Sequence, residues 1–106
     1  MEQRVLHLQV AGVTHCNHDG SKRQEIIGRC DIGERLLLVP EPNNLTDPNA
    51  MKVCRANGQQ VGYIASSDRL RIPKQSRVYV DRISRPDGKP CALGIRLRIE
   101  VDPEIH

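Results

Sequence analysis

The chain has 106 residues, with 16 Lys and Arg against 13 Asp and Glu and a formal net charge of +3. This length is typical of one domain, so we expect a single domain over residues 1–106. The small positive excess does not by itself indicate nucleic-acid binding, and no apolar run reaches the roughly 20 residues that a membrane-spanning helix needs. The N-terminus lacks a secretory pattern, so we expect a cytoplasmic protein with reduced cysteines.

The chain begins with a predicted strand, followed by a polar loop and a predicted short helix. Apolar and polar residues alternate over Leu6–Val10 and continue through Ala11–Val13, which predicts a strand. A polar loop follows over Thr14–Gly20. Ser21 is the expected N-cap of a short helix over Lys22–Cys30, whose apolar positions share one face.

The middle of the chain predicts a strand and then a hairpin. Arg35–Val39 is a short apolar run that favours a central strand. Ala50–Arg55 and Gln60–Ile64 flank an Asn-Gly pair, which is typical of a tight hairpin turn. Ser66–Leu70 is expected to form one helical turn.

The C-terminal third completes a β-rich domain. Ser76–Ile83 predicts a strand, Arg85–Pro90 a turn, and Cys91–Val101 the clearest alternating strand of the chain. About six strands with one or two short helices predict an all-β fold, a small OB-like or SH3-like barrel. With no Phe or Trp, its core must be aliphatic, with Cys54 and Cys91 as small core residues.

The segment Glu41–Val53 is the most unusual part of the sequence. It places Asn43, Asn44, Asp47 and Asn49 in a proline-punctuated loop between two predicted strands. Such a loop suits recognition of a polar ligand, because its side chains supply donors and acceptors on a rigid frame. The alternative is a structural turn, in which Asn and Asp bond only to their own backbone.

The same segment resembles a known family, the HIRAN domain. Glu41-Pro-Asn-Asn44, Asp47, Asn49–Val53 and Gly58–Ile64 are similar to its signature. Upstream, the elements that also resemble the family are Val10–Val13, Gly20–Gln24 and Gly33–Leu37.

The resemblance implies a modified OB-like barrel that binds DNA, captures the 3′-hydroxyl end of a single strand and acts in DNA repair or replication-fork processing. It also implies a bacterial, nucleoid-associated protein, with a helicase or nuclease as a candidate partner. Asn44 and Asp47 would lie at the terminal nucleotide, and Tyr63 would replace a neighbouring histidine. The sequence departs from the eukaryotic pattern at His15 and Thr46, near or at positions of stacking tyrosines.

The predicted DNA-binding residues combine this resemblance with side-chain chemistry. A carboxylate at Asp47 accepts a hydrogen bond from a terminal hydroxyl but repels a terminal phosphate. Tyr63 and His15 are candidates for base stacking, although a half-buried tyrosine and a solvated histidine are the plainer readings. The complete predicted set is Thr14, His15, Arg23, Asn43, Asn44, Asp47, Lys52 and Tyr63.

Cationic side chains that could contact phosphates are scattered along the chain, and such a set is often only a solvated face. Arg23 stands out because it lies in the Gly20–Gln24 run, and Arg96 and Arg98 could extend the patch from the last strand. The other candidate phosphate contacts are Lys22, Lys52, Arg55, Arg69, Arg71 and Lys74.

Other classes of function have little support in the sequence. His15, Cys16, His18 and Cys30 do not have the spacing of a zinc site, so no metal or cofactor is expected. The sequence has no nucleophile–base pattern and no phosphate-binding glycine loop, so we do not expect an enzyme. The main alternative is an accessory module that docks a helicase or repair partner without binding DNA itself.

Overall fold

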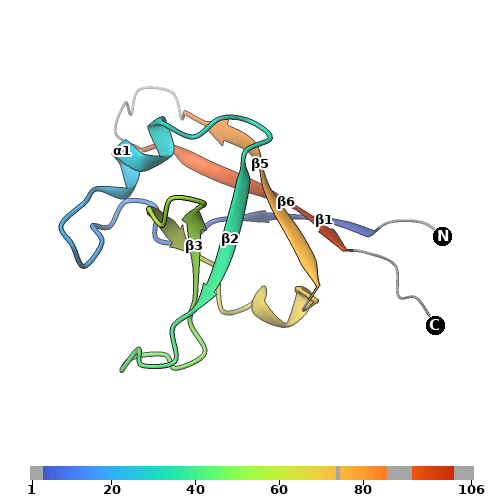
Figure 1. Cartoon of the computed structure of the whole chain (residues 1–106), viewed down its shortest axis with the longest axis horizontal. Helices are drawn as coiled ribbons and strands as arrows, with labels where there is room; N and C mark the ends of the chain where they lie inside the picture. The colour runs from blue at the N-terminus through green and yellow to red at the C-terminus, as the bar shows by residue number, and fades with distance from the viewer. Residues whose placement is uncertain (1–3, 74, 86–91, 102–106) are drawn as a thin grey trace.

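The chain forms a single curled sheet closed by a short bridge, as seen in a computed structural model that describes residues 4–73, 75–85 and 92–101. The six strands are all antiparallel and lie in the order β1-β6-β5-β2-β3-β4 (Figure 1). The elements in chain order are β1 (Arg4–Gln9), α1 (Arg23–Gly28), β2 (Arg35–Pro40), β3 (Met51–Arg55), β4 (Gln60–Tyr63), the 3-10 helix η1 (Arg69–Arg71), β5 (Ser76–Ser84) and β6 (Gly94–Val101). The predicted all-β, six-stranded barrel-like fold is confirmed.

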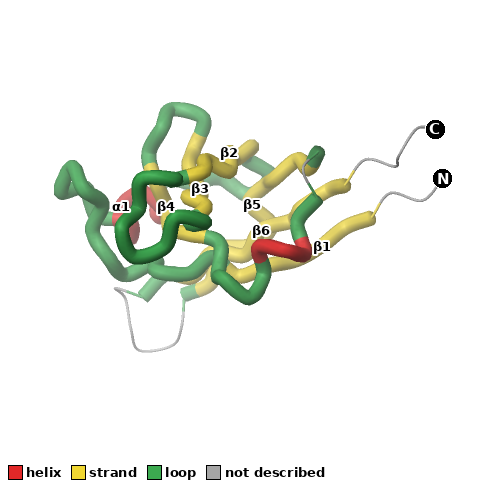
Figure 2. Tube along the Cα trace, turned by 90° about the horizontal axis from the view of Figure 1, so that it is seen from below, coloured by secondary structure: helices red, strands yellow, loops and turns green. Residues whose placement is uncertain are grey.

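Alternation along the strands places aliphatic side chains on one face of the sheet. On β6, Ile95, Leu97 and Ile99 are fully buried, whereas Arg96 is exposed. The two isoleucines of α1, Ile26 and Ile27, enter the same core. Strands form the centre in Figure 2, with α1 at one end. The core contains no Phe or Trp, because the sequence has none.

The edge strand β4 does not stay open, because the chain after β1 pairs with it. The Ala11 and Tyr63 backbones exchange two hydrogen bonds, of 2.8 and 2.9 Å. Gly62 permits this approach, since a Cβ there would lie 2.5 Å from the Ala11 carbonyl oxygen and equally close to Val10. The bridge fixes Tyr63 against the N-terminal segment.

The predicted hairpin between β3 and β4 is confirmed. The Arg55 amide bonds the Gln59 carbonyl at 2.8 Å, and the Gly58 amide bonds the Arg55 carbonyl at 2.9 Å. Gly58 has a φ of +91°, which is the left-handed conformation that the turn needs. A register shift between Val53 and Cys54 adds a bulge to the same strand pair.

Three local predictions need correction. Ser21 does not cap α1, because the cap position is Lys22 and no side chain bonds the helix start; the Ser21 hydroxyl instead donates to Asp19. The helix is shorter than predicted and ends at Gly28. The predicted helical turn at residues 66–70 lies later, at η1.

Cys54 and Cys91 are predicted to be small core residues. Cys54 is buried in β3, as expected of a core residue. Cys91, Lys74 and most of the turn at 85–90 lie outside the described residues. Among the described helices, none is long and apolar enough to cross a membrane.

Candidate functional site

The loop between β2 and β3 is held rigid by its own polar groups. The Asn44 side-chain oxygen accepts hydrogen bonds from the backbone amides of Thr46 (3.0 Å) and Asp47 (2.9 Å), which is an Asx-turn. The Glu41 amide bonds the Ala50 carbonyl at 3.0 Å and closes the base of the loop. Figure 1 shows this loop projecting beyond the end of the sheet. The Asn44 side-chain oxygen therefore stabilises the loop through two backbone amides.

Glu41 is the centre of the network, and sequence reasoning did not include it among the site residues. Its Oε1 accepts hydrogen bonds from the Asn44 Nδ2 (2.6 Å) and from the Tyr63 hydroxyl (2.9 Å). Its Oε2 lies 3.9 Å from the Lys52 Nζ. These donors, the Asn44 amide first, hold the pKa of Glu41 below its ordinary 4.5. The carboxylate thus ties the loop to both strands of the hairpin.

Tyr63 lies half-buried at the end of β4, with its backbone, ring and hydroxyl all held. Lys52 is its cross-strand partner on β3. The Arg23 guanidinium carbon lies 5.2 Å from the centroid of the Tyr63 ring, a cation–π contact. The hydroxyl donates to Glu41, as described above. The ring is consequently a fixed surface rather than a mobile one.

Asp47 is paired with Arg69 of η1, a residue 22 positions along the chain. Asp47 Oδ2 lies 2.9 Å from Arg69 Nη2, and Asp47 Oδ1 accepts a bond of 3.1 Å from Nη1, so the pair is bidentate. Oδ1 also accepts the Asn49 backbone amide at 3.1 Å. The Arg69 hydrogen bond is the main cause that lowers the pKa of Asp47 from its ordinary 3.8. The Asp47 side chain is still 38% exposed to solvent.

A hollow of about 200 Å³ gathers three of the predicted residues. Its lining consists of Asn44, Thr46, Asp47, Ala50, Tyr63 and Ile64. Asn43 is exposed on the same loop but does not line the hollow, and Lys52 is joined to it through Glu41. The amide, carboxylate and aromatic groups that the sequence singled out therefore converge on one place.

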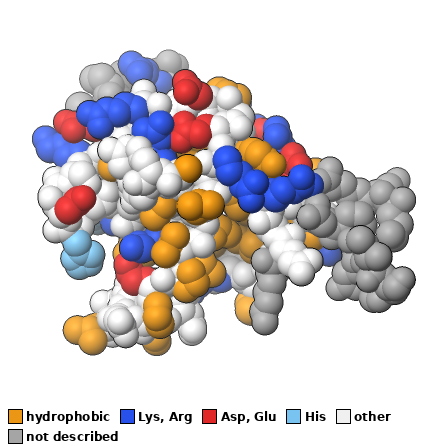
Figure 3. Space-filling model, viewed as in Figure 1, with side chains coloured by type: hydrophobic (Ala, Val, Ile, Leu, Met, Phe, Trp, Pro, Cys, Tyr) orange, Lys and Arg blue, Asp and Glu red, His pale blue; other side chains and the backbone are white. Residues whose placement is uncertain are grey.

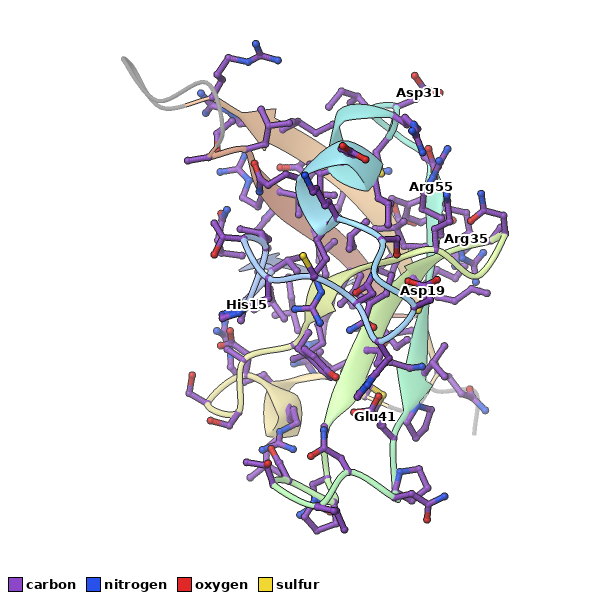
Figure 4. All side chains as sticks on the ribbon, turned by 90° about the vertical axis from the view of Figure 1, so that its left-hand side faces the viewer. His15, Asp19, Asp31, Arg35, Glu41 and Arg55 are labelled. Carbon is purple, nitrogen blue, oxygen red and sulfur yellow. The ribbon has the colours of Figure 1, made fainter. Side chains whose placement is uncertain are left out.

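A second hollow, of about 540 Å³, gathers the remaining predicted residues. Its lining consists of Thr14, His15, Cys16, Lys22, Arg23, Gln24, Glu25 and Leu93. Arg23 lines this hollow and also contacts the Tyr63 ring of the first, so the two are adjacent. In Figure 4, His15 and Glu41 mark the two regions, and Asp31 lies at the far end of the molecule from Glu41.

Arg23 is a buried brace between segments. Only 6% of it is exposed, its Nε donates to Asn17 Oδ1 at 2.7 Å, and its Nη1 donates to the Gly12 carbonyl at 2.8 Å. Gly12 has a φ of +71° and would crowd this guanidinium if it carried a Cβ. Contact of Arg23 with a phosphate stays a prediction, and the bonds present assign it a structural part as well.

Most of the predicted phosphate-binding cations near the site already have carboxylate partners. Lys52 pairs with Glu41 and Arg69 with Asp47, as above, while Arg71 pairs with Asp68 at 3.1 Å. Arg55 pairs with Glu34 at 2.7 Å. Lys22 is exposed and has no ion-pair partner among the described residues. On the last strand, Arg96 and Arg98 also bond to carboxylates.

The possible metal ligands do not assemble. Within residues 4–73, 75–85 and 92–101, no group of three or more His, Cys, Asp or Glu side chains could hold a metal ion. Cys30 is buried, and burial raises its pKa to about 11, so its thiol is protonated at neutral pH. Cys16 is exposed.

A third hollow, of about 280 Å³, lies on the other side of Ile64 and is mainly apolar. Figure 3 shows hydrophobic side chains gathered near the lower end of β2, in this region. The lining consists of Leu38, Pro40, Met51, Ile64, Arg69, Ile72 and Pro73. Arg69 therefore lies between this apolar hollow and Asp47 of the first hollow.

Comparison with known proteins gives one family and two similar structures. The sequence model of the HIRAN domain matches residues 5–100. The HIRAN domain of human HLTF is 24% identical, with a TM-score of 0.59, over 91% of this chain and 73% of that chain. A protein from Lactobacillus plantarum is 19% identical, with a TM-score of 0.56, over 93% of this chain and 98% of that chain. No curated protein matches the sequence.

Proposed function

Because this chain belongs to the HIRAN domain family, we propose that it is a DNA-binding module that takes the 3′-hydroxyl end of a single strand into the hollow beside Asp47. The observation that supports this most is the state of the Asp47 carboxylate. It is ionised, partly exposed and held in one orientation by Arg69 and Asn49.

The bonding capacity of Asp47 suits a terminal hydroxyl. An ionised carboxylate offers about four lone-pair sites, and the described residues occupy two at Oδ1 and one at Oδ2. One acceptor site therefore remains at Oδ2. A 3′-hydroxyl can donate to it, whereas a 3′-phosphate brings negative charge and is repelled.

Tyr63 supplies the aromatic surface for the terminal base. Its ring lines the hollow and is braced by Arg23, so little conformational freedom is lost when a base stacks on it. Thr46 lines the same hollow and His15 the adjacent one, at or near the positions where the family resemblance places tyrosines. We therefore propose one main stacking residue, with a contribution of about 1–3 kcal/mol per base.

The electrostatic contribution is expected to be modest. Lys52 and Arg69 are already paired with acids, and each phosphate that a protein cation neutralises on a single strand steepens the log–log salt slope by about 0.7. A shallow salt dependence combined with a clear preference for one kind of 3′ end would fit this site. Such ends arise in DNA repair and at replication forks, which is where we propose that the module acts.

Fluorescence anisotropy with two oligonucleotides tests the proposal directly. Both carry the dye at the 5′ end, and one ends in a 3′-hydroxyl and the other in a 3′-phosphate. We expect tighter binding of the hydroxyl end and loss of this preference in Asp47→Ala. Asp31→Ala is the matched control, because Asp31 is an exposed aspartate far from the site. Equal affinity of the unaltered protein for both ends would refute end recognition.

A second candidate function is docking of a protein partner such as a helicase or nuclease, and the apolar hollow favours it. Leu70 of η1 is fully exposed beside Arg69 and Arg71, close in sequence to the hollow residues Ile72 and Pro73. A partner bound there should stay bound after nuclease treatment, whereas an association that depends on DNA should be lost. Replacing Leu70 by Ser would weaken such docking without changing affinity for DNA.

A further inference from the structure

The carboxylate proposed to accept the 3′ end is not alone, because a guanidinium lies directly against it. Arg69 has 20% of its side chain exposed, and its two terminal nitrogens meet the two oxygens of Asp47. Planar, bidentate geometry of this kind is what guanidinium uses for carboxylates and for phosphates alike. Asp47 therefore occupies a group that could otherwise bind an anion.

The aliphatic part of Arg69 has neighbours other than Asp47. Its side chain lines the apolar hollow with Ile64 and Ile72, which supports the aliphatic stem. Asp47 is anchored separately, because its backbone amide bonds Asn44 and its Oδ1 accepts the Asn49 amide. Loss of charge at Asp47 would thus free the guanidinium without removing the frame that positions it.

We propose that Arg69 is a specificity-determining residue and that the Asp47–Arg69 pair is a masked phosphate site at the strand terminus. In the unaltered protein, the guanidinium fixes Asp47 for a hydroxyl donor and partly offsets its repulsion of the last phosphodiester. With Asp47 neutralised, the same guanidinium binds a 3′-phosphate. This inference rests on the proposed function, since it concerns the terminus bound in that hollow.

Opposite charge changes at the two residues should move end preference in opposite directions. We define the preference as the Kd for the 3′-phosphate oligonucleotide divided by the Kd for the 3′-hydroxyl one. Asp47→Asn keeps the size of the side chain and exposes Arg69, so the ratio falls below one. Arg69→Gln leaves an unpaired carboxylate, so the ratio rises. We expect about tenfold in each direction, the scale of one charge-assisted hydrogen bond.

The experiment measures this ratio for four proteins: the unaltered chain, the two single variants and the double variant. Arg71→Gln is the control, because Arg71 lies on the same 3-10 helix and carries the same charge, but pairs with Asp68 at the surface. If the pair had only a structural role, the variants would lose affinity for both oligonucleotides equally and the ratio would not change. That result would overturn the inference. The double variant should have a ratio near one.

The two proposals fail in distinguishable ways. If the unaltered protein prefers the hydroxyl end but Asp47→Asn gains nothing for the phosphate end, the inference fails and the proposed function stands. If the unaltered protein binds neither oligonucleotide, the proposed function fails. Inorganic phosphate then decides the inference by NMR titration: Asp47→Asn must bind it near Arg69, and the double variant must not. Absence of binding to Asp47→Asn overturns the masked site.

Discussion

Gly62→Ala should open the bridge that closes the barrel. The added Cβ would lie 2.5 Å from the Ala11 carbonyl oxygen, which is backbone and cannot rotate away. Relief requires the segment after β1 to move off β4 and to give up its two hydrogen bonds to Tyr63. At about 0.5–1.5 kcal/mol for each bond, and with about 1–3 kcal/mol for overpacking, we expect a loss of about 2–6 kcal/mol.

Thermal unfolding followed by circular dichroism measures this loss. For a domain near 100 residues, about 1 kcal/mol corresponds to a Tm change of about 4–8 °C, so Gly62→Ala should melt lower by about 8 °C or more. Gly28→Ala is the matched control. It ends α1, and its Cβ would lie 3.7 Å from Leu93, an ordinary contact, so it should be neutral or slightly stabilising.

Hydrogen exchange locates the damage. The Ala11 and Tyr63 amides should lose protection in Gly62→Ala, while the amides of the β5–β6 pair keep theirs. If Gly62→Ala melts with the unaltered protein and both amides remain protected, the close approach of these segments does not hold the barrel closed, and the argument is refuted.

Three further predictions concern acid stability, stacking and the buried arginine. The Arg55 hydrogen bond lowers the pKa of Glu34 from 4.5, so the pair stabilises the fold above that pH and loses its effect as the pH falls. Glu34→Gln should therefore reduce the dependence of Tm on pH between pH 7 and 3. An unchanged dependence would contradict this. Tyr63→Leu should weaken single-strand binding by about tenfold in anisotropy, whereas Tyr63→Phe should keep most of it; equal losses would argue against stacking. Arg23→Lys should lower the free energy of unfolding in urea by about 2–3 kcal/mol, since lysine supplies one nitrogen where Arg23 uses two, Nε and Nη1, on separate acceptors. An unchanged midpoint would count against the brace.

The sequence predicted what depends on local pattern. Alternation in the last strand identified its buried and exposed residues, and the Asn-Gly pair identified the hairpin, since Gly58 alone can adopt the turn's positive φ at little cost. The prediction of Ser21 as the helix N-cap was wrong, because Asp19 is a competing acceptor two residues away. Asp19 accepts hydrogen bonds from both the hydroxyl and the backbone amide of Ser21.

The centre of the candidate site depends on long-range contacts, which local pattern does not encode. Glu41 meets Tyr63 across 22 residues, and Asp47 meets Arg69 across the same separation. The amides and carboxylate of the loop were recognisable from their density, but the acid that joins them to the hairpin was not. Burial of Arg23 was hidden for the same reason, because its partner Gly12 lies on a different segment.

Two tyrosines and no tryptophan make the chain its own optical probe. Tyr79 is held between the guanidinium groups of Arg35 and Arg98 on the outer side of the sheet, while Tyr63 donates its hydroxyl to a carboxylate beside the first hollow. Substituting Phe for Tyr79 would leave Tyr63 as the single ultraviolet emitter, so a change in its emission would report a rearrangement around its hydroxyl without an attached dye.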